Sequence, residues 1–184
     1  MAYDIKYRVN HRKAIEAIVW LATEKPGIDI YHIAKVLFYA EKQHINRYAR
    51  PIIGDTYKSG DDGPFPSVIR DLIHRNEQFL SLEIIQQLDR AIITEKTPYP
   101  TPKPLRESDI DYFSETDIEC LTESLNKYGD MSFEDLKQLT HEEKSYYGTD
   151  PNKDIDYALM IDDDNPYKEE ICSEILETSP YVQM

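Results

Sequence analysis

The sequence predicts a mainly α, compact helical domain with a short β-hairpin or β-arm inserted between helices. Apolar residues recur at helical spacing, behind residues that favour helix N-termini, in five or more segments. Only one region, between two of these segments, combines strand-forming residues with a glycine and prolines that favour a turn. Residues 30–67 contain both kinds of element, and the rest of the chain is arranged around them.

A first helix is expected after Asn10, which is a good N-cap. Its apolar face is formed by Ile15, Ile18, Val19 and Ala22. Pro26-Gly27 ends it. The second helix is expected after Asp29, and its face carries Ile33, Leu37, Ala40 and His44. Arg50-Pro51 stops this helix, because a residue before proline is pushed out of the helical region. A helix this apolar must be buried on most sides.

Strand-forming residues follow, namely Ile52, Ile53, Thr56 and Tyr57 around Gly54-Asp55. A turn is expected at residues 61–64, since glycine can take a positive φ and proline has a fixed one. Pro66 is placed to open a helix over residues 67–74. The residues expected to shape this path are Gly54, Gly63, Pro64 and Pro66.

Residues 79–88 fit either a helix or an extended run. Prolines at positions 98, 100, 102 and 104 forbid a helix or a central strand over residues 91–106 and predict a stiff connector or a β-arm. Capping signals at Ser114 and Ser132 predict two more helices. Their exposed residues are too acidic to contact phosphates, so this pair is not expected to read nucleic acid.

Net charge is −14 over 184 residues, and it is unevenly spread. Residues 1–60 hold 10 Lys/Arg and 6 Asp/Glu, whereas residues 61–184 hold 11 and 29. Such a field repels nucleic acid and attracts a basic protein surface. The chain has no apolar run of about 18 residues and no signal-peptide core, so we expect no membrane association and a cytoplasmic location. The 2 cysteines form no metal or disulfide pattern.

Four segments occur in a characteristic order. They read KVLFYAEKQH at residues 35–44, RPIIGDTY at 50–57, GPFPS at 63–67 and LTHE at 139–142. This series resembles the Panacea, or SocA-like antitoxin, domain. An ordered series is more specific than any single motif. The resemblance implies such a domain in residues 1–160, followed by an acidic C-terminal helix or tail in residues 161–184. Asp62 departs from the pattern, because a tyrosine usually precedes Gly-Pro there.

By this resemblance the chain looks like an antitoxin of a bacterial or phage toxin–antitoxin system, including those of prophages. It is expected to neutralise a cognate toxin, encoded by the adjacent gene, through direct protein–protein binding. Some family members instead hand the toxin to a protease, so a protease adaptor is the alternative. No catalytic activity and no cofactor are expected, since the sequence has neither a G-x-S-x-G nor a P-loop pattern.

The predicted partner-binding residues are Tyr57, Asp61, Asp62, Phe65 and His141, the last from the LTHE segment. Acidic and aromatic groups together suit a basic protein surface that carries an apolar anchor. The alternative interpretation is that Phe65 belongs to the core and the aspartates only face solvent.

Two alternatives from other classes are a metal-binding enzyme and a DNA-binding protein that regulates its own gene. Glu41 and His44 form an E-x-x-H pair, which places two ligands on one helix face, and His141 could join them. A di-metal carboxylate site needs two such pairs, and the sequence has one. No metal is therefore expected.

Overall fold

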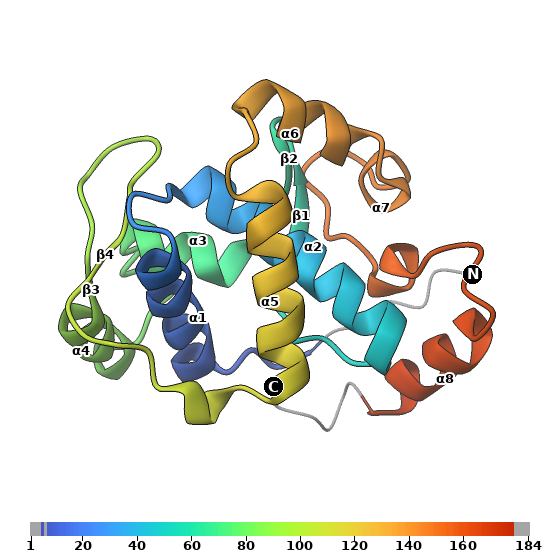
Figure 1. The fold of residues 1–184 in the computed structure, drawn as a ribbon, viewed down its shortest axis with the longest axis horizontal. Helices are drawn as coiled ribbons and strands as arrows, with labels where there is room; N and C mark the ends of the chain where they lie inside the picture. The colour runs from blue at the N-terminus through green and yellow to red at the C-terminus, as the bar shows by residue number, and fades with distance from the viewer. Residues whose placement is uncertain (1–4, 6, 179–184) are drawn as a thin grey trace.

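The computed structural model describes residue 5 and residues 7–178. It is mainly helical, as predicted, with a small hairpin between the second and third helices (Figure 1). The α-helices are α1 (His11–Glu24), α2 (Ile30–Tyr48), α3 (Ser67–His74), α4 (Leu82–Ala91), α5 (Glu115–Tyr128), α6 (Phe133–His141), α7 (Lys144–Tyr147) and α8 (Lys168–Thr178). The other elements are β1 (Tyr57–Gly60), β2 (Gly63–Pro66), β3 (Ile92–Ile93), β4 (Lys103–Pro104) and the 3-10 helices η1 (Ile110–Tyr112) and η2 (Tyr157–Met160).

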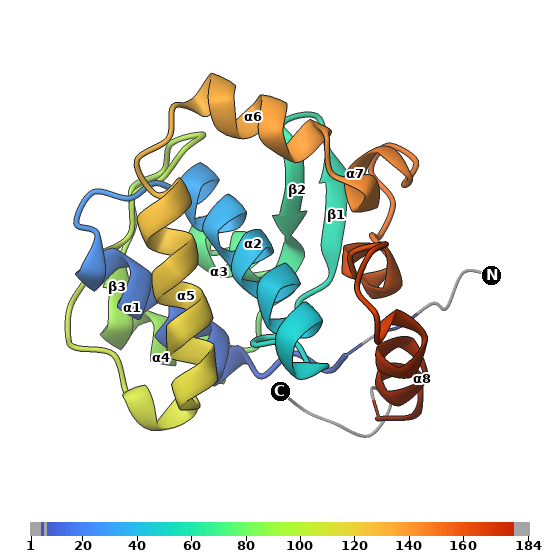
Figure 2. The same ribbon diagram turned by 45° about the vertical axis from the view of Figure 1, so that its right-hand side comes forward.

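Helix α2 is the centre of the core. Its fully buried side chains include Ile33, Val36, Leu37, Phe38 and Ala40. Helix α5 lies alongside it, and the hairpin stands on another side (Figure 2). The helix begins where the sequence predicted, because the Asp29 side chain accepts a hydrogen bond from the backbone N–H of His32 (2.9 Å). The prediction of a helix buried on most sides is confirmed.

Residues 52–56 do not form a strand, which corrects the sequence-based expectation. Ile52 and Ile53 are buried, but their backbone N–H groups donate to the carboxylate of Glu41 and not to a neighbouring strand. Strand pairing begins only at Tyr57, where β1 runs antiparallel to β2. Gly60 pairs with Gly63 across a tight turn formed by residues 61–62.

Helix α3 follows the hairpin directly, and its N-terminus is capped from a distance. Pro66 occupies the N-cap position, and its side chain cannot accept a hydrogen bond from the first N–H groups of the helix. The buried carboxylate of Asp55 accepts these hydrogen bonds instead, from the backbone N–H groups of Val68 (3.0 Å) and Ile69 (2.9 Å). Asp55 thus fixes the angle at which the chain leaves the hairpin for α3.

The proline-rich segment forms a β-arm, one of the two possibilities that the sequence left open. Strands β3 and β4 pair antiparallel over two residues each, and residues 82–91 form the helix α4 before them. The arm reaches the start of α2, where the backbone N–H of Ile30 donates to the Pro100 carbonyl (3.0 Å). The arm therefore borders the same end of α2 as the hairpin.

The last helix docks on the core. Helix α8 buries Ile171, Cys172 and Ile175. Just before this helix, Oδ1 of Asn165 accepts a hydrogen bond from the backbone N–H of Tyr167 (3.0 Å). Leu176 of the same helix faces outward and is 44% exposed. No helix in the described part of the chain is long and apolar enough to cross a membrane.

Candidate functional site

The β1–β2 hairpin is held rigidly at its tip by three helices. Lys35 on α2 donates from Nζ to the Pro64 carbonyl (2.9 Å), and Tyr146 on α7 donates to the Gly60 carbonyl (2.9 Å). Helix α6 crosses above the tip (Figure 2). Gly63 lies directly against α6, because a Cβ added at Gly63 would lie 2.5 Å from Oγ1 of Thr140 on that helix. The tip is therefore presented as a fixed surface and not as a loose loop.

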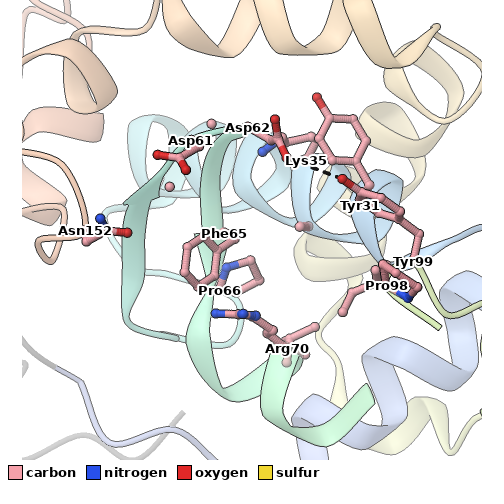
Figure 3. Close-up of a pocket in the computed structure, with 15 residues that line it drawn as sticks. Tyr31, Lys35, Asp61, Asp62, Phe65, Pro66, Arg70, Pro98, Tyr99 and Asn152 are labelled. Atoms are coloured by element: carbon pink, nitrogen blue, oxygen red, sulfur yellow. Dashed lines mark hydrogen bonds between the residues drawn. The ribbon is translucent and has the colours of Figure 1, made fainter. Parts of the chain in front are cut away.

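A groove of about 360 Å³ opens beside this hairpin. We call it the hairpin groove (Figure 3). Its walls come from the start of α2, the hairpin, the start of α3 and the proline-rich arm. The side chains that matter below are Tyr31, Lys35, Asp62, Phe65, Arg70 and Tyr99.

Four of the five predicted partner-binding residues lie around the hairpin tip. Asp61 is exposed, and half-buried Asp62 binds Nζ of Lys137 through Oδ1 (2.8 Å). This bond to Lys137 lowers the pKa of Asp62. Phe65 and His141 are half-buried. We call Asp61, Asp62, Phe65 and His141 the hairpin face.

Tyr57 is the exception among the predicted contacts. Its side chain is 0% exposed, with its ring packed edge-on against Phe38 at 5.7 Å between centroids. Unlike Lys35, Tyr57 does not line the hairpin groove, so a partner that docks on the folded chain cannot touch it. An alternation of inward and outward side chains along β1 would have shown this, because Tyr57 and Ser59 share the inner face of the strand.

The Phe65 ring is fixed on both sides. A Cβ on Gly60 would lie 2.8 Å from this ring, so the glycine lets the ring lie against the hairpin backbone. The guanidinium of Arg70 sits 5.0 Å from the ring centroid. Such a cation–π contact orients the ring before any partner arrives.

His141 belongs to the hairpin tip. Its ring stacks on Tyr146 with 4.4 Å between centroids. Burial lowers its pKa, with Lys137 and Lys35 acting in the same direction and a hydrogen bond with the Asp61 backbone opposing them. The ring thus joins α6 and α7 to the turn.

Lys35 was not among the predicted site residues. This lysine is 2% exposed, and its Nζ lies 4.8 Å from the centroid of the Tyr31 ring. Burial lowers its pKa to about 7, with Lys137 adding to the effect and Asp62 opposing it. The signal in the sequence was a single lysine inside the apolar run Ile33 to Ala40.

Glu41 and His44 are engaged in holding the backbone. Glu41 accepts hydrogen bonds from the N–H groups of Ile52 (2.5 Å), Ile53 (2.9 Å) and Gly54 (3.0 Å), with Gly54 at φ 69°. Within residue 5 and residues 7–178, no group of three or more His, Cys, Asp or Glu side chains could hold a metal ion. The suggested set of Glu41, His44 and His141 is thus not brought together.

We expect the His44 ring to make the fold less stable in mild acid. The ring donates from Nδ1 to the Arg50 carbonyl (2.7 Å). Burial lowers its pKa, the Arg50 and Lys13 charges reinforce this effect, and the hydrogen bond to the Arg50 carbonyl and Asp117 oppose it. The folded His44 ring therefore binds a proton less readily than the same ring in the unfolded chain, where histidine titrates at about 6.5. The contribution of His44 to the free energy of unfolding must then fall as the pH drops through that value, whereas Glu41 and Asp55, whose pKa values burial raises, act in the opposite direction.

Urea unfolding at several pH values between about 7.5 and about 5.5 measures this dependence. The variant His44→Asn keeps a donor for the Arg50 carbonyl and cannot titrate, so its stability should fall less, or rise more, than that of the unchanged chain as the pH drops. Equal pH dependence in the two proteins would contradict the role given to His44.

The fold and the groove together define a class: a helical domain that presents a rigid hairpin beside an aromatic, partly charged groove. The family model described as "Antitoxin SocA-like, Panacea domain" matches residues 33–146. The chain belongs to this family, since the match covers more than half of it and includes all four segments noted above. No curated protein and no solved structure matches the chain.

Proposed function

We propose that this chain is an antitoxin that neutralises a toxin by binding it directly through the hairpin face. Membership of the SocA-like antitoxin family implies a toxin partner in general. One observation supports this surface. Asp61, Asp62, Phe65 and His141 come from segments far apart in the sequence and lie together at the hairpin tip.

Rigidity supports the same surface. Contacts from α2, α6 and α7 hold the tip, so little conformational freedom remains to be lost when a partner binds. The half-buried Phe65 supplies an apolar anchor, and the two aspartates at the rim favour a basic partner. In this proposal the chain has no catalytic turnover, and neutralisation lasts as long as the complex does.

The experiment that tests this function reverses charge at the tip. The double variant Asp61→Lys with Asp62→Lys should slow association with the product of the adjacent gene and weaken the salt dependence of that rate. The matched control is Glu169→Lys with Glu170→Lys, which makes the same charge change on exposed positions of α8.

Association rates of the purified pair are measured at two salt concentrations, and growth is followed when each variant is co-expressed with that product. A loss of association confined to the hairpin variant supports the proposal. Equal effects of the two charge reversals would show that only the total charge matters, and would contradict the role of the hairpin face in binding.

A further inference from the structure

Most cations of this acidic chain are paired with carboxylates, including the buried pair Lys13–Asp117 and the exposed pair Arg47–Glu123. Lys35 and Arg70 differ. Neither forms an ion pair with any other residue among those the structure describes, although both line the hairpin groove. Their polar and aromatic contacts are a backbone carbonyl and two aromatic rings.

An unpaired buried ammonium is costly. Lys35 is 2% exposed, and its one hydrogen-bond acceptor, the Pro64 carbonyl, leaves donor capacity unused. Burial without a paired anion is also the reason its pKa falls to about 7. Asp62 acts on Lys35 only through space and opposes this fall in pKa. A carboxylate entering the groove would bring an anion within hydrogen-bond reach of the ammonium group, which favours its charged form.

Arg70 completes the recognition. It is exposed on the first turns of α3 and lies over Phe65, so the edge of its guanidinium can donate to a carboxylate while its face stays on the ring. Figure 3 shows Arg70 beside Phe65 and Pro66, with Asp61 and Asp62 at the tip beyond them. Asp62 is already bonded to Lys137 and lies 3.5 Å from the Tyr99 hydroxyl.

We propose that the hairpin groove binds one acidic side chain of the toxin, an Asp or Glu next to an aromatic or large apolar residue, through Lys35 and Arg70. This inference rests on the proposed function and makes it more specific. The apolar neighbour packs on Phe65 and Tyr99, while the aspartates at the rim meet the basic surroundings of that acidic residue. The groove carries positive charge and its rim carries negative charge. This pattern fixes the register of the partner and disfavours a uniformly basic surface.

The groove is tested first without a toxin. Three blocked dipeptides, N-acetyl-Phe-Glu-amide, N-acetyl-Phe-Gln-amide and N-acetyl-Phe-Lys-amide, are titrated into the full chain while its amide resonances are followed. The Glu dipeptide should produce saturable shifts at Gly60 and Gly63 and bind about tenfold more tightly than the Gln dipeptide. Equal binding of the two, or tighter binding of the Lys dipeptide, would overturn the inference.

Variants assign the effect to the two cations. Arg70→Gln lies on the surface and should reduce binding of the Glu dipeptide to the level of the Gln dipeptide. Arg90→Gln is the matched control, because Arg90 is exposed on α4 and outside the groove. Lys35→Met should act like Arg70→Gln, and its circular dichroism spectrum shows whether it still folds. If Arg70→Gln binds as tightly as the unchanged chain, the assignment is wrong.

The toxin arm distinguishes this inference from the proposed function. Arg70→Glu should abolish growth rescue against the product of the adjacent gene, and suppressors selected in that gene should replace an Asp or Glu by Lys or Arg. Full rescue by Arg70→Glu, or suppressors that leave every acidic residue unchanged, would refute the inference. If no complex with that product forms at all, the proposed function fails, while the dipeptide result still decides whether the groove reads a carboxylate.

Discussion

Replacing Glu41 by alanine should unfold this chain or lower its melting temperature by roughly 10 °C or more. The carboxylate accepts from three consecutive buried backbone N–H groups, at Ile52, Ile53 and Gly54. Each buried donor left without a partner costs about 1–3 kcal/mol, so the total loss is about 3 kcal/mol at the least. That is a large share of the roughly 5–15 kcal/mol that holds a typical domain together.

The variant Glu41→Gln separates hydrogen bonding from packing. Its amide oxygen can still accept from Ile53 and Gly54, but its NH₂ group would face the N–H of Ile52, so one donor stays unsatisfied. We expect its melting temperature to lie between those of the unchanged chain and Glu41→Ala. Glu142→Ala, at the exposed C-cap residue that follows α6, is the control and should change little. An alanine variant at position 41 as stable as this control would contradict the role of the carboxylate.

Gly63→Ala should cost about 3 kcal/mol or more, the second largest effect we expect. Gly63 has φ +96°, a conformation that strains any residue with a Cβ. The new Cβ would also lie 2.5 Å from Oγ1 of Thr140 and 2.9 Å from Nζ of Lys35. The hairpin would have to move away from both α2 and α6.

Gly27→Ala is the matched control for this change. Gly27 has φ +90°, and nothing lies within 4 Å of an added Cβ. Its cost is therefore the backbone strain alone, about 1–2 kcal/mol. Thermal unfolding of the two variants measures the difference, which reports the close approach of the hairpin to α2 and α6. Equal melting temperatures would mean that the tip is not held closely against these helices.

Local signals predicted the helices well because each helix start is determined by neighbouring residues. The N-caps Asn10, Asp29, Ser114 and Ser132 all accept the expected backbone hydrogen bonds, and the capping box at Ser114 is complete. The β-hairpin followed from the same kind of information, since its glycine and prolines restrict only their own backbone angles. Residues 79–88 remained ambiguous because helix and strand both fit a short apolar run.

Tertiary contacts explain what the sequence did not reveal. Ile52 and Ile53 have strand-forming side chains, but their backbone N–H groups donate to the carboxylate of Glu41, which lies eleven and twelve residues earlier. Glu41 itself suggested a metal ligand because an E-x-x-H spacing describes one helix face and not what lies opposite it. Tyr57 was assigned to the partner surface on composition, whereas burial depends on which side of β1 meets α2. Lys35 was missed because it stands in an apolar run and its hydrogen-bond acceptor, the Pro64 carbonyl, lies 29 residues away in sequence.

Amide hydrogen exchange on the purified complex with the product of the adjacent gene shows whether this chain neutralises a toxin through its hairpin face. We expect a stable complex in which protection increases over residues 57–66 and 133–147, and growth rescue that fails when this face is altered. Growth rescue without a detectable complex, or protection confined to another part of the chain such as α8, would contradict it.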